Sequence, residues 1–195
     1  MKFSKIFHPV IHLPPNVEVY DFTQGYDPQR LRDSYGVGKY GEKRKNMYTS
    51  SLFQEKEPRD IHLGIDIAAP VGESIYAFDD GIILDFGFNE GDGNYGATLI
   101  TEHKVEDQQF WVLWGHLSRA SISNKVKGQS FRLGDVLAWV GDRYENGGWN
   151  SHLHFQLSLH KPSTFDLPGV VSEKDWPLAQ LQYPDPRIVL GPLYS

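Results

Sequence analysis

Apolar and polar residues alternate strictly through one short segment, Ile61-His62-Leu63-Gly64-Ile65-Asp66-Ile67. This is the period of a β-strand that buries one face, so His62, Gly64 and Asp66 are expected on one side and the apolar residues on the other. A second segment, Ser151-His152-Leu153-His154-Phe155-Gln156-Leu157, alternates in the same way. Two strands that carry His and Asp on one face, with the other face anchored in a core, are suited to holding a metal ion rigidly.

The rest of the chain favours a strand-and-turn protein. Its 195 residues fit one ordinary domain with a sizeable core. It contains 12 prolines, 19 glycines and 13% aromatic residues, a composition that favours strands and turns over helices. Between residues 61 and 160, short β-rich segments are separated by turn residues. We therefore predict a mainly all-β fold, an antiparallel sheet arranged as a sandwich or open barrel, with long irregular terminal segments.

The predicted organisation has three parts. Residues 1–34 are interpreted as an irregular N-terminal arm, 35–165 as the main domain, and 166–195 as a C-terminal extension packed on it. Residues 35–60 look like a loop, and the charged run Glu42-Lys43-Arg44-Lys45 within them is interpreted as a solvated face. A short helix is expected to begin near Ser172, which is followed three positions later by the acidic Asp175.

Composition also excludes several functions. The absence of cysteine excludes disulfides, thiolate zinc sites and cysteine nucleophiles. A net charge of -6 and a pI near 5.7 argue against a nucleic-acid partner. No segment is long enough to span a membrane, so no membrane partner is expected. The first residues lack the continuous apolar region of a signal peptide, and a cytoplasmic location is expected, with a periplasmic or secreted one as the alternative.

Three polar residues of the two strands can form a metal site: His62, Asp66 and one histidine of His152-Leu153-His154. On a fully extended strand, His62 and Asp66 would lie about 13 Å apart. Both reach one ion only if the chain bends, and Gly64 makes a bend reasonable. Two imidazoles and a carboxylate are the ligand set of a catalytic zinc, which keeps a fourth position open for water.

Further motifs follow in order along the chain: Asp80-Gly81-Ile82-Ile83, Tyr95-Gly96, Gly115-His116-Leu117 and Leu133-Gly134-Asp135-Val136. Together with the two strand motifs they resemble, over residues 60 to 160, the core of the M23 metallopeptidases of the lysostaphin or LytM type, also called duplicated hybrid motif domains. The resemblance implies an antiparallel sheet with a groove over one Zn²⁺ per chain. It implies His62, Asp66 and His154 as the metal ligands, and His116 and His152 as catalytic residues beside a metal-bound water.

The activity implied by the resemblance is that of a zinc metalloendopeptidase, which hydrolyses a peptide bond through the metal-bound water. One of His116 and His152 would act as the general base, and the other would bind the oxyanion or protonate the leaving amine. Which does which stays open, as does the oligomeric state. The expected partner is a peptide or peptidoglycan-like substrate. Two alternatives remain: a non-catalytic binding or scaffold domain that retains zinc, and an amide hydrolase that acts on a small metabolite.

The chain departs from the family pattern at positions expected to shape the substrate groove. Ala97 stands where Asn is common, Trp114 where Tyr is frequent, and Gln156 where Glu is frequent. The loop Asn146-Gly147-Gly148-Trp149-Asn150-Ser151 is also unlike the usual approach to the second motif, and Trp149 is expected to restrict a ligand or stack against it.

Three other segments suggest a particular branch of the family: Tyr40 to Phe53, Asn146 to Trp149, and Asp185-Pro186. They are similar to M23 domains found between a kinase-like phosphotransferase domain and a class-III aminotransferase domain. This resemblance implies an intracellular substrate that is not part of a cell wall.

Overall fold

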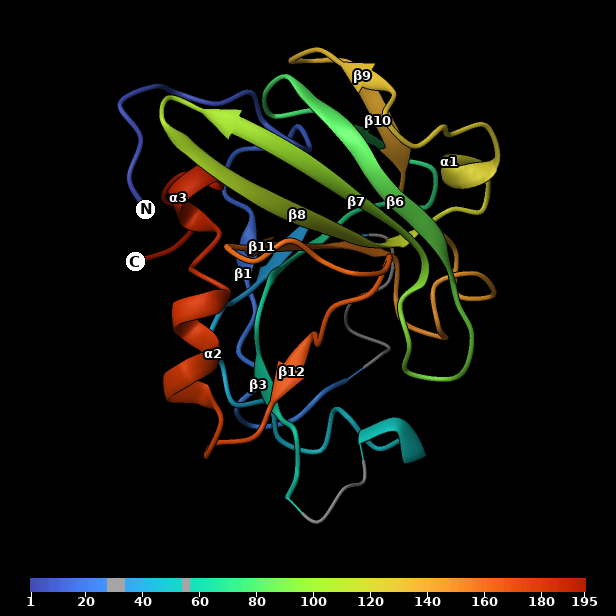
Figure 1. The fold of residues 1–195 in the computed structure, drawn as a ribbon. Helices are drawn as coiled ribbons and strands as arrows, with labels where there is room; N and C mark the ends of the chain where they lie inside the picture. Colours follow the sequence, from blue (N-terminus) through green and yellow to red (C-terminus); the bar gives the residue numbers. More distant parts are fainter. Residues whose placement is uncertain (28–33, 54–56) are drawn as a thin grey trace.

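The structure, a computed structural model, describes residues 1–27, 34–53 and 57–195 (Figure 1). Residues 28–33 of the predicted N-terminal arm therefore lie outside the described residues. The elements, in chain order, are β1 (Glu18–Val19), β2 (Gly36–Gly38), the 3₁₀ helix η1 (Ser51–Phe53), β3 (Ile61–His62), β4 (Ile65–Ala68), β5 (Ser74–Tyr76), β6 (Gly81–Asn89), β7 (Gly96–Val105), β8 (Gln108–Leu117), α1 (Ala120–Ser123), β9 (Ser130–Phe131), β10 (Val136–Trp139), β11 (His152–Ser158), β12 (Val170–Val171), α2 (Trp176–Gln182) and α3 (Arg187–Leu190).

The main sheet has, within the described residues, eight strands in the order β1-β2-β4-β11-β8-β7-β6-β9. Its neighbours are antiparallel except for the parallel pair β1 and β2. Two small sheets, β10-β5 and β12-β3, accompany it. The three long strands β6, β7 and β8 cross the upper half of the molecule in Figure 1. The predicted mainly antiparallel β fold is confirmed, and the main sheet is open and does not close into a barrel.

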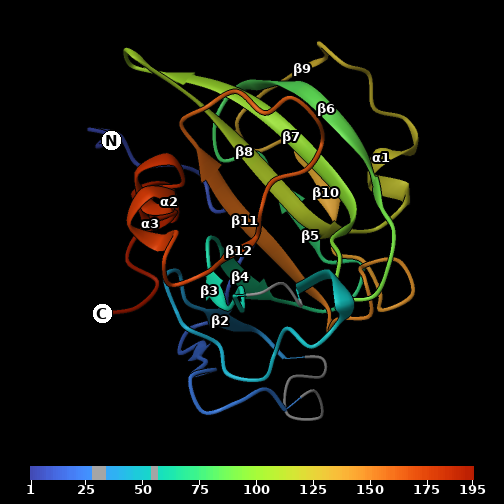
Figure 2. The same ribbon diagram turned by 60° about the horizontal axis from the view of Figure 1, so that its bottom comes forward.

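Hydrophobic residues cover both faces of the main sheet. Strand β8 shows this most clearly, because Val112 and Trp114 belong to one core cluster whereas Trp111 and Leu113 belong to the other. The first cluster joins the sheet to the small sheet β10-β5, and the second joins it to α2 and to the segment that precedes β12. Figure 2 shows α2 and α3 beside the main sheet. Long strands buried on both faces form a rigid base for the residues at their ends.

The segment from Ile61 to Ile67 is divided into two strands at Gly64. Strand β3 pairs with β12, whereas β4 lies in the main sheet between β2 and β11. The bend predicted at Gly64 is confirmed. The expectation of one shared apolar face is wrong for Leu63, which packs in the second core cluster while Ile65 and Ile67 pack in the first. The division turns His62 and Asp66 towards the same space.

Residues 36–38 form a buried strand rather than part of a loop, which corrects the interpretation of residues 35–60. A Cβ atom at Gly36 would lie 2.1 Å from the ring of Tyr20, so only glycine allows this ring to pack against β2. Two glycines around one valine look like a loop in the sequence. Here they instead mark a close approach between β2 and the residues that follow β1.

The helix expected near Ser172 is present. Ser172 Oγ donates a hydrogen bond to Asp175 Oδ2 (2.7 Å) and accepts one from the Asp175 backbone N–H (3.2 Å). Helix α2 begins at the next residue, Trp176, and has Pro177 in its first turn, where the missing N–H costs nothing. In the described part of the chain, no helix combines the length and apolar character needed to cross a membrane.

Candidate metal centre

The bend at Gly64 and the pairing of β4 with β11 bring three polar side chains together. His62 lies at the end of β3, Asp66 in β4, and His154 directly opposite Asp66 in β11. All three are buried, with 1%, 7% and 3% of their surfaces exposed. Each offers a ligand atom within 4.8 Å of the other two. The structure therefore places the His-x-x-x-Asp pair and the second histidine of His-x-His at one point.

The three facing atoms form a nearly equilateral triangle. His62 Nε2 lies 3.0 Å from His154 Nδ1 and 3.2 Å from Asp66 Oδ1, and the third side, His154 Nδ1 to Asp66 Oδ1, is 3.0 Å. Tetrahedral zinc with bonds of about 2.0–2.1 Å holds neighbouring ligand atoms about 3.3 Å apart. The triangle thus has almost the size that zinc requires.

The outer nitrogens of the two imidazoles determine their tautomers. His62 Nδ1 lies 3.0 Å from the carbonyl oxygen of Lys39, which can only accept a hydrogen. His154 Nε2 lies 2.9 Å from Gln156 Oε1, and the Gln156 amide nitrogen donates to the carbonyl of Pro168 (3.1 Å), which fixes Oε1 as the acceptor. We assign the hydrogens accordingly, so His62 Nε2 and His154 Nδ1 both carry lone pairs.

Three lone-pair donors thus face one another inside the protein, and such an arrangement favours a cation. Burial, together with the nearby Arg44, lowers the pKa of His62 to about 4, so this imidazole is neutral at physiological pH. Burial opposes the ionisation of Asp66, but His62 and Arg44 hold its pKa well below its usual value. With the tautomers assigned above, two imidazoles and one carboxylate match the donor set of a catalytic zinc site.

Two further histidines lie at the edge of this triangle, and the loop before β11 orients both. His116 Nδ1 donates to the carbonyl of Asn146 (2.8 Å), and His152 Nδ1 donates to that of Asn150 (2.7 Å). Both therefore present Nε2 as an acceptor, and His152 Nε2 lies 3.7 Å from Asp66 Oδ1. The two rings are 4.3 Å apart. The unusual loop noted in the sequence is thus the support of both side chains.

The backbone at His116 is held in the left-handed region, with φ of 62°. Such a conformation costs a non-glycine residue about 1–3 kcal/mol and persists only when its surroundings impose it. Here the N–H of His116 donates to Tyr95 and its carbonyl accepts from Gly141, both at 3.0 Å. Burial and the neighbouring His152 and His154 lower the pKa of His116 well below its usual value. The strained residue is therefore a neutral imidazole held at the edge of the triangle.

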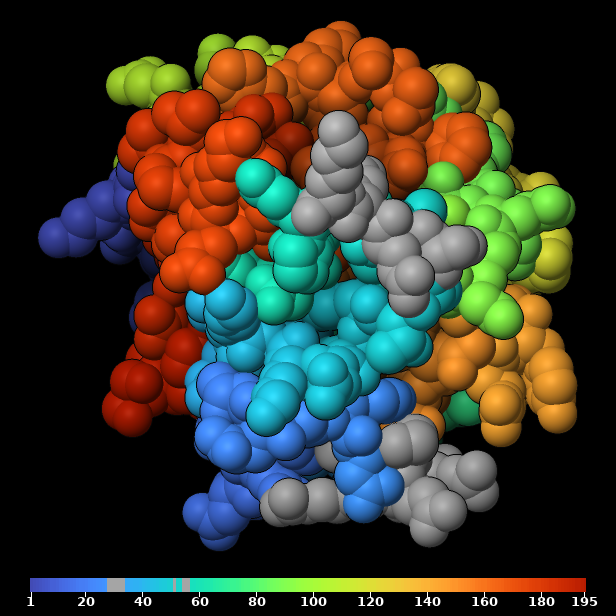
Figure 3. Space-filling model, turned by 90° about the horizontal axis from the view of Figure 1, so that it is seen from below, coloured from blue at the N-terminus to red at the C-terminus, as the bar shows by residue number. Residues whose placement is uncertain are grey.

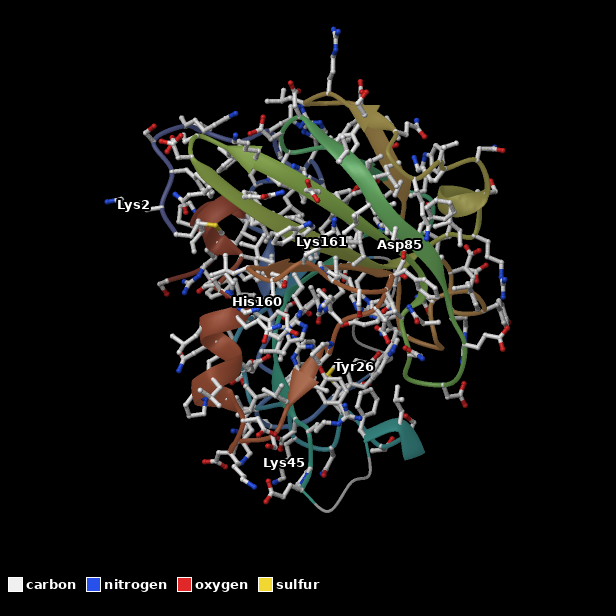
Figure 4. The ribbon with its side chains drawn as sticks, viewed as in Figure 1. Lys2, Tyr26, Lys45, Asp85, His160 and Lys161 are labelled. Carbon is white, nitrogen blue, oxygen red and sulfur yellow. The ribbon has the colours of Figure 1, made fainter. Side chains whose placement is uncertain are left out.

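Arg44 supports Asp66 from behind, a role that the sequence did not indicate. Its Nη1 donates to Asp66 Oδ2 at 2.6 Å, and its Nε donates to Glu42 Oε2 at 3.3 Å. Arg44 and Glu42 are 1% and 6% exposed, so the interpretation of residues 42–45 as a solvated face is wrong for these two. Lys43 and Lys45 are exposed, and Figure 4 shows Lys45 at the lower edge of the molecule. All four residues of this run are charged, so the alternation of buried and exposed side chains leaves no signal in the sequence.

The departures from the family pattern have different consequences. Ala97 and Trp114 are fully buried in the first core cluster, and Trp114 Nε1 donates to Thr101 Oγ1 (2.9 Å). The expectation that these two residues shape a substrate groove is therefore wrong. Gln156, in contrast, bonds directly to His154. An amide accepts this N–H as a carboxylate would, without adding a negative charge.

A cavity of about 290 Å³ opens onto the three facing side chains. It is lined by residues from three distant parts of the chain, which fall within 44–53 and at Arg59, within 93–95 and within 166–170, together with His116, Trp149 and His152. The segments coloured cyan, green and orange in Figure 3 meet on the same face of the molecule. The triangle formed by His62, Asp66 and His154 is thus accessible from a pocket of the size that binds small ligands or part of a peptide.

The fold is mainly β, and its site combines a buried triangle of His, Asp and His with two further histidines. This combination is that of a metal-dependent hydrolase. A profile described as "Peptidase family M23" matches residues 60–166, which is more than half of the chain, and the chain belongs to this family. M23 peptidases are zinc-dependent hydrolases, as the sequence resemblance implied.

Three relatives illustrate the similarity. The chain is 32% identical over 100 residues to the DD-carboxypeptidase/endopeptidase Mpg of Neisseria meningitidis, covering 51% of this chain and 20% of that protein. It is 29% identical over 120 residues to the peptidoglycan DD-endopeptidase ShyC of Vibrio cholerae, covering 57% and 24%. The catalytic domain of lysostaphin from Staphylococcus simulans is 19% identical, with a TM-score of 0.47, covering 80% of this chain and 98% of that one. The match therefore spans a quarter or less of the length of the two full-length relatives, Mpg and ShyC.

Proposed function

We propose that this protein is a zinc-dependent peptidase that hydrolyses a peptide bond at the triangle of His62, Asp66 and His154. The observation that carries this proposal is the convergence of His62 Nε2, His154 Nδ1 and Asp66 Oδ1 at 3.0–3.2 Å. The outer hydrogen bonds to Lys39 and Gln156 assign the protons of both imidazoles to their far nitrogens. Zinc bound there supplies a Lewis acid that polarises the scissile carbonyl and lowers the pKa of the attacking water.

We assign the base to His152 and a second substrate contact to His116. Both present a lone pair at Nε2, but His152 Nε2 lies 3.7 Å from Asp66 Oδ1 and hence beside the ligand triangle. His152 takes the proton of the attacking water and returns it to the leaving amine. His116, whose ring lies 4.3 Å from that of His152, accepts a hydrogen bond at its own Nε2 from the water or from the N–H of the scissile amide. Carbonyl groups of the loop keep both rings in these orientations.

The first substrates to test follow from the relatives. Two of them are named as DD-endopeptidases, one of which acts on peptidoglycan, and this supports a wall-derived peptide as one candidate. A cavity of about 290 Å³ also has the size for a small amide. A screen of wall-derived peptides, glycine-rich peptides and small amides with the zinc-loaded protein distinguishes these classes. We expect hydrolysis of one class that stops when a chelator removes zinc.

The variant His116→Ala tests the catalytic assignment. It removes a side chain that touches none of the three ligand atoms, so zinc remains bound while turnover falls by about 10²-fold or more. The matched control is His160→Ala, which removes an exposed histidine just beyond the end of β11 and leaves turnover unchanged (Figure 4). Normal peptide cleavage by His116→Ala would contradict the assignment. Bound zinc without hydrolysis of any substrate would instead favour the binding or scaffold alternative.

We also propose that the domain belongs to the M23 branch found between phosphotransferase and class-III aminotransferase domains. The similarity of residues 40–53, 146–149 and 185–186 to that branch supports this placement. If the domain belongs to this branch, a cytoplasmic, non-wall substrate replaces the wall-derived peptide as the first candidate. Sequencing the coding region on both sides of the domain tests the proposal, and flanking domains of other types would contradict it.

A further inference from the structure

A row of aromatic rings leads away from the candidate catalytic residue His116. The ring of Trp149 lies 6.4 Å from that of His116, Tyr48 lies 5.9 Å from Trp149, and Phe53 lies 5.0 Å from Tyr48. All four side chains line the cavity that opens onto His62, Asp66 and His154. The row Trp149, Tyr48 and Phe53, called the aromatic wall below, is therefore continuous with the proposed catalytic site.

The aromatic wall is already assembled without a ligand. Tyr48 Oη accepts a hydrogen bond from Arg44 Nη1 at 3.0 Å, and burial raises the pKa of Tyr48 to about 12, so its ring is neutral. Behind Trp149 lies the ring of Tyr26, 6.0 Å away and labelled in Figure 4. The carbonyl of Trp149 accepts from the Asn146 amide at 3.1 Å. These contacts fix the rings before a substrate arrives, which reduces the entropy lost on binding.

Glycine in the opposite loop lets Phe53 approach closely. A Cβ atom at Gly93 would lie 2.9 Å from Phe53 Cε2, and the backbone N–H of Gly93 donates to the carbonyl of Gly147 (2.9 Å). Segments 50–53, 93–94 and 147–149 therefore form one continuous side of the cavity. A substrate group beside His116 on this side meets aromatic faces.

The chemistry of the wall selects for apolar groups. The Tyr48 hydroxyl is already hydrogen-bonded to Arg44, so the wall offers ring surface together with the Trp149 indole N–H, which has no hydrogen-bond partner among the described residues. Aromatic and large aliphatic groups gain from contact with such a surface through burial and through offset or edge-to-face ring packing. A glycine residue offers almost no apolar area for such contact.

We propose that the aromatic wall is a specificity subsite for a large apolar or aromatic group on the His116 side of the scissile amide. The substrate class is thus a peptide or small amide with a hydrophobic side chain at this position, rather than a polyglycine chain. This inference rests on the proposed hydrolytic function for its kinetic consequence, but the binding of the apolar group depends on the wall alone.

The kinetic test uses zinc-loaded full-length protein and peptides that differ only in having Gly, Leu or Phe on either side of the scissile bond. We expect kcat/KM for the preferred Leu or Phe peptide to exceed that for the glycine peptide by about tenfold or more, equivalent to about 1.4 kcal/mol. Trp149→Ala should reduce this preference to within about threefold, and Trp149→Phe should retain most of it. The control Trp139→Ala, at a partly exposed tryptophan of β10, should leave the preference unchanged.

A binding measurement separates failure of the subsite from failure of the proposed function. Calorimetry compares N-acetyl-phenylalanine amide with N-acetyl-glycine amide, on wild-type protein and on Trp149→Ala. Tighter binding of the aromatic amide that is lost in the variant supports the subsite, even if no peptide is cleaved. Equal binding of the two amides, or a preference for glycine peptides, overturns it. If Trp149→Ala does not fold, Phe53→Ala at the far end of the wall replaces it and the same outcomes apply.

Discussion

Replacing Gly64 by alanine is expected to weaken zinc binding by about 100-fold or more, because the new methyl group occupies the space of a ligand. Its Cβ would lie 2.5 Å from His154 Cε1 and 2.6 Å from His154 Nε2, and the carbonyl of Phe155 at 2.9 Å prevents escape on the other side. The His154 ring must then move and lose its hydrogen bond to Gln156. Loss of the hydrogen-bond partner of a metal-binding histidine typically costs about 10–100-fold in metal affinity. Here the histidine itself is displaced as well. Competition with a chelator measures the change.

The matched control for this variant is Gly72→Ala in the turn after β4. Gly72 has φ of 80°, and nothing lies within 4 Å of a Cβ atom placed there. Its replacement therefore costs about 1–2 kcal/mol of backbone strain but leaves zinc affinity unchanged. Wild-type zinc affinity in Gly64→Ala would show that His154 is free to move, and would contradict the geometry of the site.

Replacing Arg44 by methionine is expected to destabilise the protein by about 3–5 kcal/mol, because the buried Asp66 then loses its arginine partner and the buried Glu42 keeps only its ion pair with Lys39. Arg44 is 1% exposed and bonds to Asp66 at 2.6 Å and to Glu42 at 3.3 Å. The variant also removes the hydrogen bond from Arg44 to Asp66 Oδ2. This bond orients the carboxylate so that Oδ1 faces the two histidines, and without it that orientation is no longer fixed. Urea unfolding in the presence of a chelator measures the stability, and chelator competition measures the zinc affinity of the folded variant.

Two comparisons show whether this effect belongs to the buried ion network. Lys43→Met, one residue away, removes an exposed cation and should leave stability essentially unchanged. Arg44→Lys keeps the charge but cannot bond to both carboxylates with the planar geometry of a guanidinium, so an intermediate loss is expected. A loss in Arg44→Met no larger than that in Lys43→Met would show that Arg44 does not hold Asp66 in place.

Most of the β architecture was predictable, because it depends on local alternation. Strand β11 keeps its period of two throughout, and its apolar residues pack in the first core cluster as expected. The segment from Ile61 to Ile67 has an equally regular pattern, yet its two halves belong to different sheets. Alternation reports which side chains are buried, but it does not report the strand partner. Strand β2 was missed because its glycines serve a close approach by Tyr20, which is a tertiary contact.

The candidate site was predictable in its residue types and less so in its supports. The strand pattern and the ligand chemistry pointed to His62, Asp66 and a histidine of the second motif. The choice of His154, and any role for His116, came only from the family resemblance. Arg44 was missed because a run of charges in a sequence is usually solvated. The carbonyls of Asn146 and Asn150, which orient the two other histidines, have no side-chain signature at all.

The zinc content of the purified protein, with His154→Ala as comparison, tests most directly whether His62, Asp66 and His154 form a metal site. The wild-type protein is predicted to retain about one zinc per chain after mild purification, the number expected for a catalytic site with three protein ligands. The variant, which keeps only two ligands, is predicted to lose the metal. Less than about half a zinc per wild-type chain, or equal zinc in the wild type and a folded His154→Ala variant, would contradict this account of the site.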